Sequence, residues 1–137
     1  MNNMAHLHEV KESWGNDPEI QNPKHLPKPT GWRVLVKPQV PMKKTASGLY
    51  LPEQTQENEE YLTAHGVILD HGPLAWCERE SGRQWHYGRW ANIGDHVTFG
   101  KYAGQKLVIG GVKLLLLNDD EITSVVPEGC NIQNYIP

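Results

Sequence analysis

The chain lacks the features that mark several classes of protein. Its only two cysteines, Cys77 and Cys130, have no CxxC or CxxH spacing beside them, which excludes a disulfide-dense secreted scaffold and a structural zinc site. No purely apolar run exceeds the four residues of 114–117, which is too short to span a bilayer. Residues 1–10 lack the continuous apolar stretch of a secretory signal. We therefore expect a cytoplasmic protein with buried or incidental thiols.

Basic charge and catalytic motifs are also scarce. Thirteen Lys and Arg against sixteen Asp and Glu give a formal charge of −3 without a basic cluster, so binding to nucleic-acid phosphates has no electrostatic support. No GxGxxG, GxSxG, HExxH or Walker-type loop occurs, and among seven scattered histidines only His6 and His8 are close in sequence. We predict no catalytic residue, no metal and no cofactor.

Turn residues and short apolar runs dominate what is present. Thirteen glycines and ten prolines interrupt the chain too often for long helices. Strand-like runs occupy residues 34–36, 66–69, 96–99, 106–109, 112–117 and 122–126. Short strands at this spacing predict an all-β barrel or sandwich. Because residues 114–117 have no polar face, we expect the barrel interior to cover one side of that run and another subunit to cover the other.

Two long polar segments lie outside this pattern. Residues 1–30 carry four prolines and no sustained apolar period, which predicts an extended arm rather than a domain. Residues 39–64 separate the first two strands and hold Lys43, Lys44 and a glutamate-rich stretch. A structureless segment of this length is usually functional or disordered, so we interpret it as a mobile loop. Alternatively, Leu49 and Leu51 are core residues of a further strand.

In their order, these segments resemble the GroES co-chaperonin family over about residues 31–126. Residues 33–36 (RVLV) resemble its first strand, and residues 44–53 (KTASGLYLPE) its mobile loop. Residues 93–99 (IGDHVTF), 102–104 (YAG), 114–117 (LLLL) and 121–122 (EI) resemble its second half. The resemblance implies a partly open β-barrel that forms a ring, a heptamer in that family. Such a ring closes a GroEL-type chaperonin and assists ATP-dependent folding without chemistry of its own.

The same resemblance implies two kinds of contact residue. The residues that would bind the chaperonin are Gly48, Leu49, Tyr50, Leu51 and Pro52. Here Gly48 permits the turn into the apolar triplet, and Pro52 ends it. Neighbouring subunits would pair their first and last strands, which protects apolar strand edges from aggregation. The interface residues are then Arg33, Val34, Leu35 and Val36 on one subunit and Ile122, Thr123, Ser124, Val125 and Val126 on the next.

The segment that corresponds to the family's roof hairpin, residues 72–92, is longer than in the family and rich in aromatic residues. Trp76, Trp85, Tyr87 and Trp90 surround a predicted turn at Ser81-Gly82. The simpler interpretation is that these rings pair across two hairpin strands. The alternative is a contact surface at the dome, facing an encapsulated client or a second protein, because Trp, Tyr and Arg commonly anchor interfaces.

The arm of residues 1–30 and a tail of residues 127–137 have no counterpart in the family pattern. With the altered roof, they suggest a phage-encoded or otherwise specialised lid in the host cytoplasm, with a capsid protein as its client or neighbour. A second hypothesis is a virion structural protein, such as a capsid decoration or connector, whose arm and tail lace neighbouring subunits together.

Overall fold

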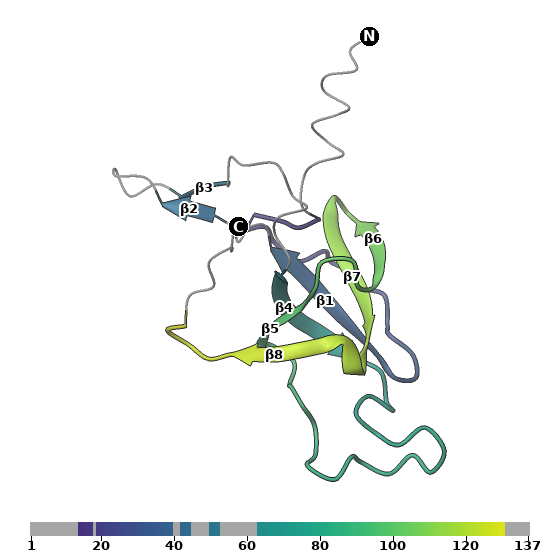
Figure 1. Ribbon diagram of the computed structural model, residues 1–137. Helices are drawn as coiled ribbons and strands as arrows, with labels where there is room; N and C mark the ends of the chain where they lie inside the picture. The colour runs from purple at the N-terminus through teal and green to yellow at the C-terminus, as the bar shows by residue number, and fades with distance from the viewer. Residues whose placement is uncertain (1–13, 18, 40–41, 45–49, 53–62, 131–137) are drawn as a thin grey trace.

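A computed structural model describes residues 14–17, 19–39, 42–44, 50–52 and 63–130 (Figure 1). These residues form short strands and turns and contain no α-helix. The strands are β1 (Arg33–Gln39), β2 (Met42–Lys44), β3 (Tyr50–Pro52), β4 (Thr63–His71), β5 (His96–Gly100), β6 (Gln105–Ile109), β7 (Val112–Asn118) and β8 (Ile122–Val126). A 3-10 turn, Asp119–Glu121, joins β7 to β8.

Six of these strands form one curved antiparallel sheet in the order β6-β7-β1-β4-β5-β8. Strands β6 and β8 are its two edges, so the sheet stays open between them. The predicted all-β, partly open barrel is thereby confirmed. Each strand predicted from an apolar run is present. Strands β1 and β4 are several residues longer than their runs because polar residues beside the runs also join the ladder, and the others match to within one residue.

The main core lies on the concave side of the sheet. Strand alternation puts Val34 and Val36 of β1 on this side, together with Leu117 of β7 and Val97 and Phe99 of β5, all at most 1% exposed. Burial of each such side chain stabilises the fold by roughly 1.5–3 kcal/mol. Strand β1 is thus the centre of the barrel wall, and its residues specify the core.

A smaller apolar cluster covers the opposite face of β1 and β7. Leu35, Val112 and Leu114 are buried there, and the partly buried side chain of Ile20 packs against them from the arm. We expected a second subunit to cover the outer face of residues 114–117. That expectation is wrong in part, because the chain's own arm covers this face.

The prediction that residues 33–36 pair with a neighbouring subunit is also wrong. On one side of β1, Val36 pairs with Leu115 of β7, and on the other it pairs with Ile68 of β4. Val34, Leu35 and Val36 are fully buried within their own chain. Because both edges of β1 already have partners, it has no free backbone edge to offer another subunit.

The roof segment, residues 72–92, hangs from one end of the barrel, and the β2–β3 hairpin lies at the opposite end (Figure 1). The predicted turn at Ser81-Gly82 is present, and Gly82 takes a φ of 73°. Instead of two hairpin strands, however, this segment contains one isolated bridge between Cys77 and Gln84. Its aromatic rings therefore do not pair across strands as the simpler interpretation predicted.

Both cysteines are free thiols, with Cys77 partly buried and Cys130 exposed. Within the described ranges, no helix is long and apolar enough to cross a membrane.

Candidate functional site

The predicted partner-binding residues lie partly in the β2–β3 hairpin. Its register pairs Lys44 with Tyr50, Lys43 with Leu51 and Met42 with Pro52. These three pairs form a two-stranded sheet separate from the six-stranded barrel. Leu51 thus lies in a further strand, as the alternative held, but this strand is not part of the barrel sheet. Gly48 and Leu49 lie outside the described residues.

Strand β8 is the other predicted contact element, and it forms an edge of the sheet. It pairs with β5 on one side, and its outer backbone edge has no strand beside it in the described chain. Thr123, Ser124 and Val125 are exposed, whereas Ile122 is buried in the core. Val125 keeps 42% of its surface exposed although it pairs with the fully buried Val97. An exposed apolar side chain on an unpaired edge suits strand pairing with another chain.

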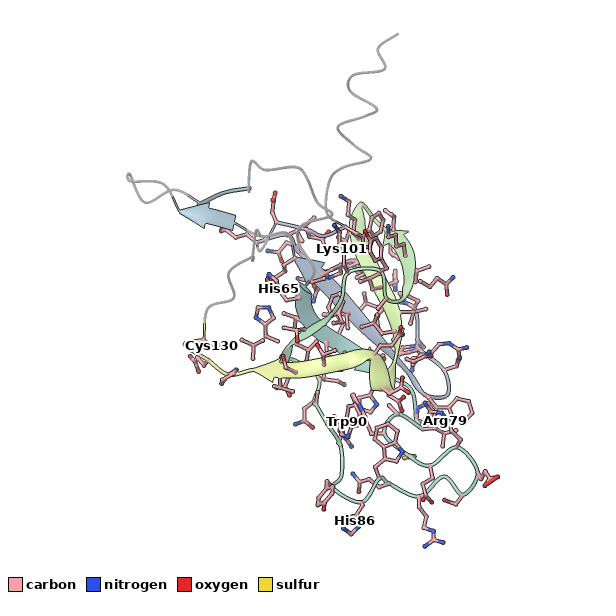
Figure 2. All side chains as sticks on the ribbon, viewed as in Figure 1. His65, Arg79, His86, Trp90, Lys101 and Cys130 are labelled. Carbon is pink, nitrogen blue, oxygen red and sulfur yellow. The ribbon has the colours of Figure 1, made fainter. Side chains whose placement is uncertain are left out.

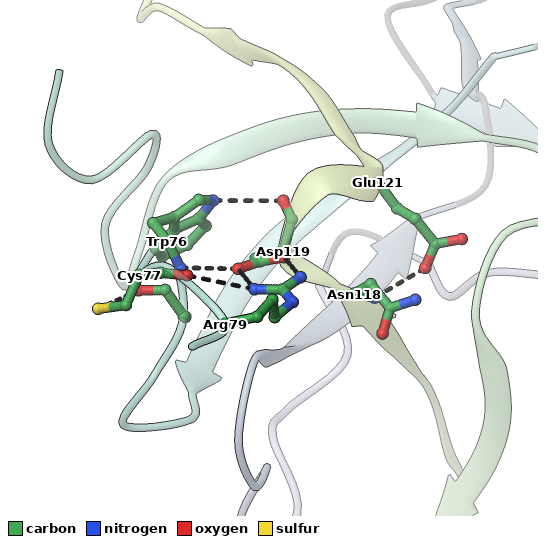
Figure 3. Close-up of polar contacts among 7 residues, drawn as sticks. Trp76, Cys77, Arg79, Asn118, Asp119 and Glu121 are labelled. Carbon is green, nitrogen blue, oxygen red and sulfur yellow. Dashed lines mark hydrogen bonds and ion pairs between the residues drawn. The ribbon is translucent and has the colours of Figure 1, made fainter. Parts of the chain in front are cut away.

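Trp76 does not contribute to a roof surface, contrary to the prediction, because it is fully buried in the main core. Its φ of 58° is unusual for a bulky residue and costs conformational energy. Two hydrogen bonds to Asp119 hold it there: its backbone N–H donates to Oδ2 at 2.8 Å, and Nε1–H donates to the Asp119 carbonyl at 3.2 Å (Figure 3). The sequence pattern did not reveal this partner, because Asp119 lies 43 positions from Trp76 along the chain.

Asp119 also binds Arg79 of the roof segment through two parallel hydrogen bonds. Arg79 Nη2 donates to Oδ1 at 2.7 Å, and Nη1 donates to Oδ2 at 3.1 Å (Figure 3). The hydrogen bond to this carboxylate is the main reason that the pKa of Arg79 is raised above its ordinary value. The Arg79 guanidinium also lies 4.7 Å from the centre of the Trp32 ring. Asp119 therefore clamps the base of the roof segment to the barrel.

The family model described as "Chaperonin 10 Kd subunit" (Cpn10) matches residues 27–126, which is most of the chain. The chain belongs to the Cpn10 family. The predicted GroES resemblance is thus confirmed, and so is the predicted co-chaperonin function. Cpn10 proteins are co-chaperones rather than catalysts.

Individual relatives agree with this family. The chain is 33% identical over 101 residues to the co-chaperonin GroES of Rhodothermus marinus, which covers 74% of this chain and 92% of the relative. It is 35% identical over 101 residues to the co-chaperonin GroES of Aromatoleum aromaticum, and the match covers 69% of this chain and 90% of the relative. It is 32% identical over 103 residues to the co-chaperonin GroES of Bacillus sp. strain PS3, and the match covers 72% of this chain and 97% of the relative.

The Cpn10 match includes the barrel, the β2–β3 hairpin and the roof segment, but it begins after most of the arm. Within the roof segment, Tyr87 is 91% exposed and Trp90 46% exposed. Trp85 is partly buried, and its ring centre lies 4.8 Å from that of Trp90. Figure 2 shows Trp90, Arg79 and His86 together at the roof end, away from His65. Three of the four predicted roof aromatics are thus at least partly accessible.

This Cpn10 protein also contains a histidine pair that its sequence does not reveal. His65 of β4 and His96 of β5 lie on the outer face, with Nδ1 of His65 2.7 Å from Nε2 of His96. One of these two nitrogens carries the hydrogen and donates the hydrogen bond, and the other accepts it. Burial and the charge of His96 lower the pKa of His65 to about 4, and burial also lowers the pKa of His96. Both rings are therefore neutral at neutral pH.

The histidine pair predicts acid-sensitive stability. The unfolded chain has an ordinary histidine pKa of 6.5, whereas the folded pKa of His65 is about 4, so below pH 6.5 the unfolded state binds more protons. The pair's contribution is complete above pH 6.5 and is lost as the pH falls toward about 4. Denaturant titrations between about pH 7 and pH 4 should show this loss, and His65→Asn should reduce it. An unchanged pH dependence in His65→Asn, relative to the exposed control His86→Asn, would contradict the prediction.

Proposed function

We propose that this protein forms a ring-shaped lid on a GroEL-type chaperonin and assists ATP-dependent protein folding in the cytoplasm. Membership of the Cpn10 family carries the proposal. It is supported by a predicted binding segment that forms its own hairpin, separate from the barrel sheet, at the end away from the roof (Figure 1). The chain needs no catalytic residue for this role, because it acts by binding.

The energetics of the loop suit a contact that must be both specific and reversible. Burial of Leu49, Tyr50 and Leu51 in an apolar groove should return roughly 1.5–3 kcal/mol per side chain. Ordering the surrounding backbone costs roughly 1–2 kcal/mol per residue. A single loop therefore binds weakly, whereas several loops on one ring bind with useful avidity and still release.

The function is tested by co-sedimentation of the purified protein with a GroEL-type chaperonin, with and without ATP. We expect binding that depends on nucleotide. A well-formed oligomer that ignores the chaperonin under both conditions would refute the proposal. The virion structural role would then become the better hypothesis, although none of the relatives described above is named as a virion protein.

The ring is proposed to close through β8. A ring needs a head-to-tail contact, in which one surface of a subunit meets a different surface of the next. Strand β8 supplies one surface, and β1 cannot supply the other, since β4 and β7 already flank it. The remaining candidates are the edge strand β6 and residues 21–30, which form no strand or helix and are mostly exposed. A heptamer, as in the family, stays a prediction.

Val125→Asp tests this interface. The substitution places a charge on the exposed apolar residue of the edge strand, where a neighbouring subunit would have to desolvate it. We expect the ring to dissociate to smaller species at subunit concentrations at least tenfold higher than for the unmodified protein, as measured by sedimentation velocity. Ile93→Asp changes a similarly exposed apolar residue in the turn before β5 and serves as the control. An intact Val125→Asp ring would contradict the assignment of β8.

We also propose that Trp85, Tyr87 and Trp90 form a contact surface at the roof. Their exposure and the clamping of the segment by Asp119 support this role, because a fixed aromatic group binds with little loss of conformational entropy. A client inside the closed chamber is the proposed partner. A phage origin and a capsid client remain predictions drawn from the added arm and the altered roof.

A further inference from the structure

The anchoring of the arm suggests a role for it in chaperonin binding. The β1–β7 ladder extends from Arg33 and Asn118 to Val36 and Leu115. In the same register the next residues would place Pro38 beside Lys113. Proline has no backbone N–H and cannot donate to β7 at this point. The ladder between β1 and β7 therefore needs another donor where β1 approaches the loop.

Asn16 of the arm supplies the missing hydrogen bonds. Its side-chain Nδ2 donates to the Lys113 carbonyl at 2.8 Å, and its Oδ1 accepts the Lys113 N–H at 2.9 Å. On the other side, Nδ2 and the Asn16 backbone N–H donate to the Pro38 carbonyl at 2.8 and 2.9 Å. The asparagine amide thus takes the place of a strand peptide between β1 and β7. Asn16 is only 5% exposed.

Further arm residues hold the same region. Trp14 donates from Nε1 to the Leu114 carbonyl at 3.2 Å, and the ammonium groups of Lys106 and Lys113 lie 5.4 and 5.3 Å from its ring centre. Lys37 Nζ donates to the Ile20 carbonyl at 3.2 Å and to Asn22 Oδ1 at 2.7 Å. The last three residues of β1, including Gln39 through its bridge to Asn16, all contact the arm.

We propose that Asn16 is a positioning residue for the chaperonin-binding loop. Strand β1 ends at Gln39 and β2 begins at Met42, so the Asn16 anchor fixes the chain immediately before the loop. A fixed root leaves fewer residues to be ordered when the loop binds, which lowers the entropic cost of binding. The anchor lies outside residues 27–126 of the family match, so it adds to the common Cpn10 architecture.

This inference rests on the proposed chaperonin binding, and Asn16→Ala tests it at two levels. In the free protein, amide hydrogen exchange of Lys113 should accelerate at least tenfold, because its N–H loses its acceptor, while exchange in β5 stays unchanged as the internal reference. In the chaperonin assay, the affinity should fall at least threefold. Asn22→Ala removes an exposed arm asparagine that contacts only Lys37 among the described bonds, and it should change both values less than twofold.

The outcomes separate the two proposals. Faster Lys113 exchange with unchanged chaperonin affinity would overturn the positioning role and leave the proposed function intact. Failure of the unmodified protein to bind any chaperonin would refute the proposed function itself. If Asn16→Ala does not fold, Asn16→Ser, whose hydroxyl replaces one of the amide's bonds, is measured in the same way, with an affinity between those of the alanine variant and the unmodified protein expected.

Discussion

Leu51→Asp should abolish co-sedimentation with a GroEL-type chaperonin while leaving the ring and the barrel intact. In the proposed complex Leu51 enters an apolar groove, and a carboxylate there loses hydration without gaining a partner. Loss of the leucine contact alone removes roughly 1.5–3 kcal/mol per loop, equivalent to about 10- to 150-fold in affinity. Because avidity multiplies the contacts of several loops, the loss for the whole ring is much larger.

The location of Leu51 explains why the effect should be confined to binding. It lies in β3, which pairs only with β2 and takes no part in the six-stranded sheet. Ile93→Asp introduces the same charge at an exposed apolar position of the barrel and should bind normally. Sedimentation velocity and thermal melting of both variants complete the comparison. If Leu51→Asp failed to assemble or melted markedly lower, the residue would have a structural role and its placement in a binding segment would be wrong.

Asp119→Ala should destabilise the protein more than any other substitution considered for the barrel. The variant removes the acceptor of the buried Trp76 N–H and breaks the paired bonds to Arg79. An unsatisfied buried donor and the loss of a charged hydrogen bond together cost about 2–4 kcal/mol. For a chain of this size the melting temperature should fall by roughly 10 °C, measured at a fixed subunit concentration.

A double-mutant cycle with Arg79→Met distinguishes the clamp from a general packing effect. Removal of Arg79 leaves the fully buried Asp119 carboxylate without its cation, so the single variant should also lose stability. The double variant should lose clearly less than the sum of the two single losses, because neither charge is then left without its partner. Additive losses would show that Arg79 and Asp119 act independently. An Asp119→Ala variant as stable as the unmodified protein would exclude the clamp altogether.

The clamp also connects the roof to the rest of the fold. Trp76 holds a left-handed backbone conformation in the core, and Arg79 follows three positions later on the surface. Asp119 binds both, so one carboxylate fixes the point at which the roof segment leaves the barrel. We expect Asp119→Ala to increase hydrogen exchange in residues 76–85 as well as to lower the melting temperature, since the Trp76 and Trp85 amides depend on this geometry.

The sequence alone determined the fold class and the family of this protein. Alternating apolar residues such as Val97 and Phe99 specify strands with one buried face, and that local pattern survives without knowledge of strand partners. The ordered motifs from residue 33 to residue 122 identified the GroES resemblance that the Cpn10 match confirmed. The segment around Leu51 stood out because its apolar residues lie between charged stretches.

Which strands pair, and what covers their faces, was decided only by the tertiary structure. The composition of residues 33–36 suits an edge strand as well as a central one. Only the strand order shows that β1 lies between two other strands. The sequence does not distinguish Trp76 from Trp90, yet Trp76 lies fully buried in the core, hydrogen-bonded to a residue 43 positions away, whereas Trp90 is 46% exposed. The bonds of Asn16 to Lys113 span 97 positions. Such contacts depend on the closure of long loops around a shared core, and no local sequence pattern records that closure.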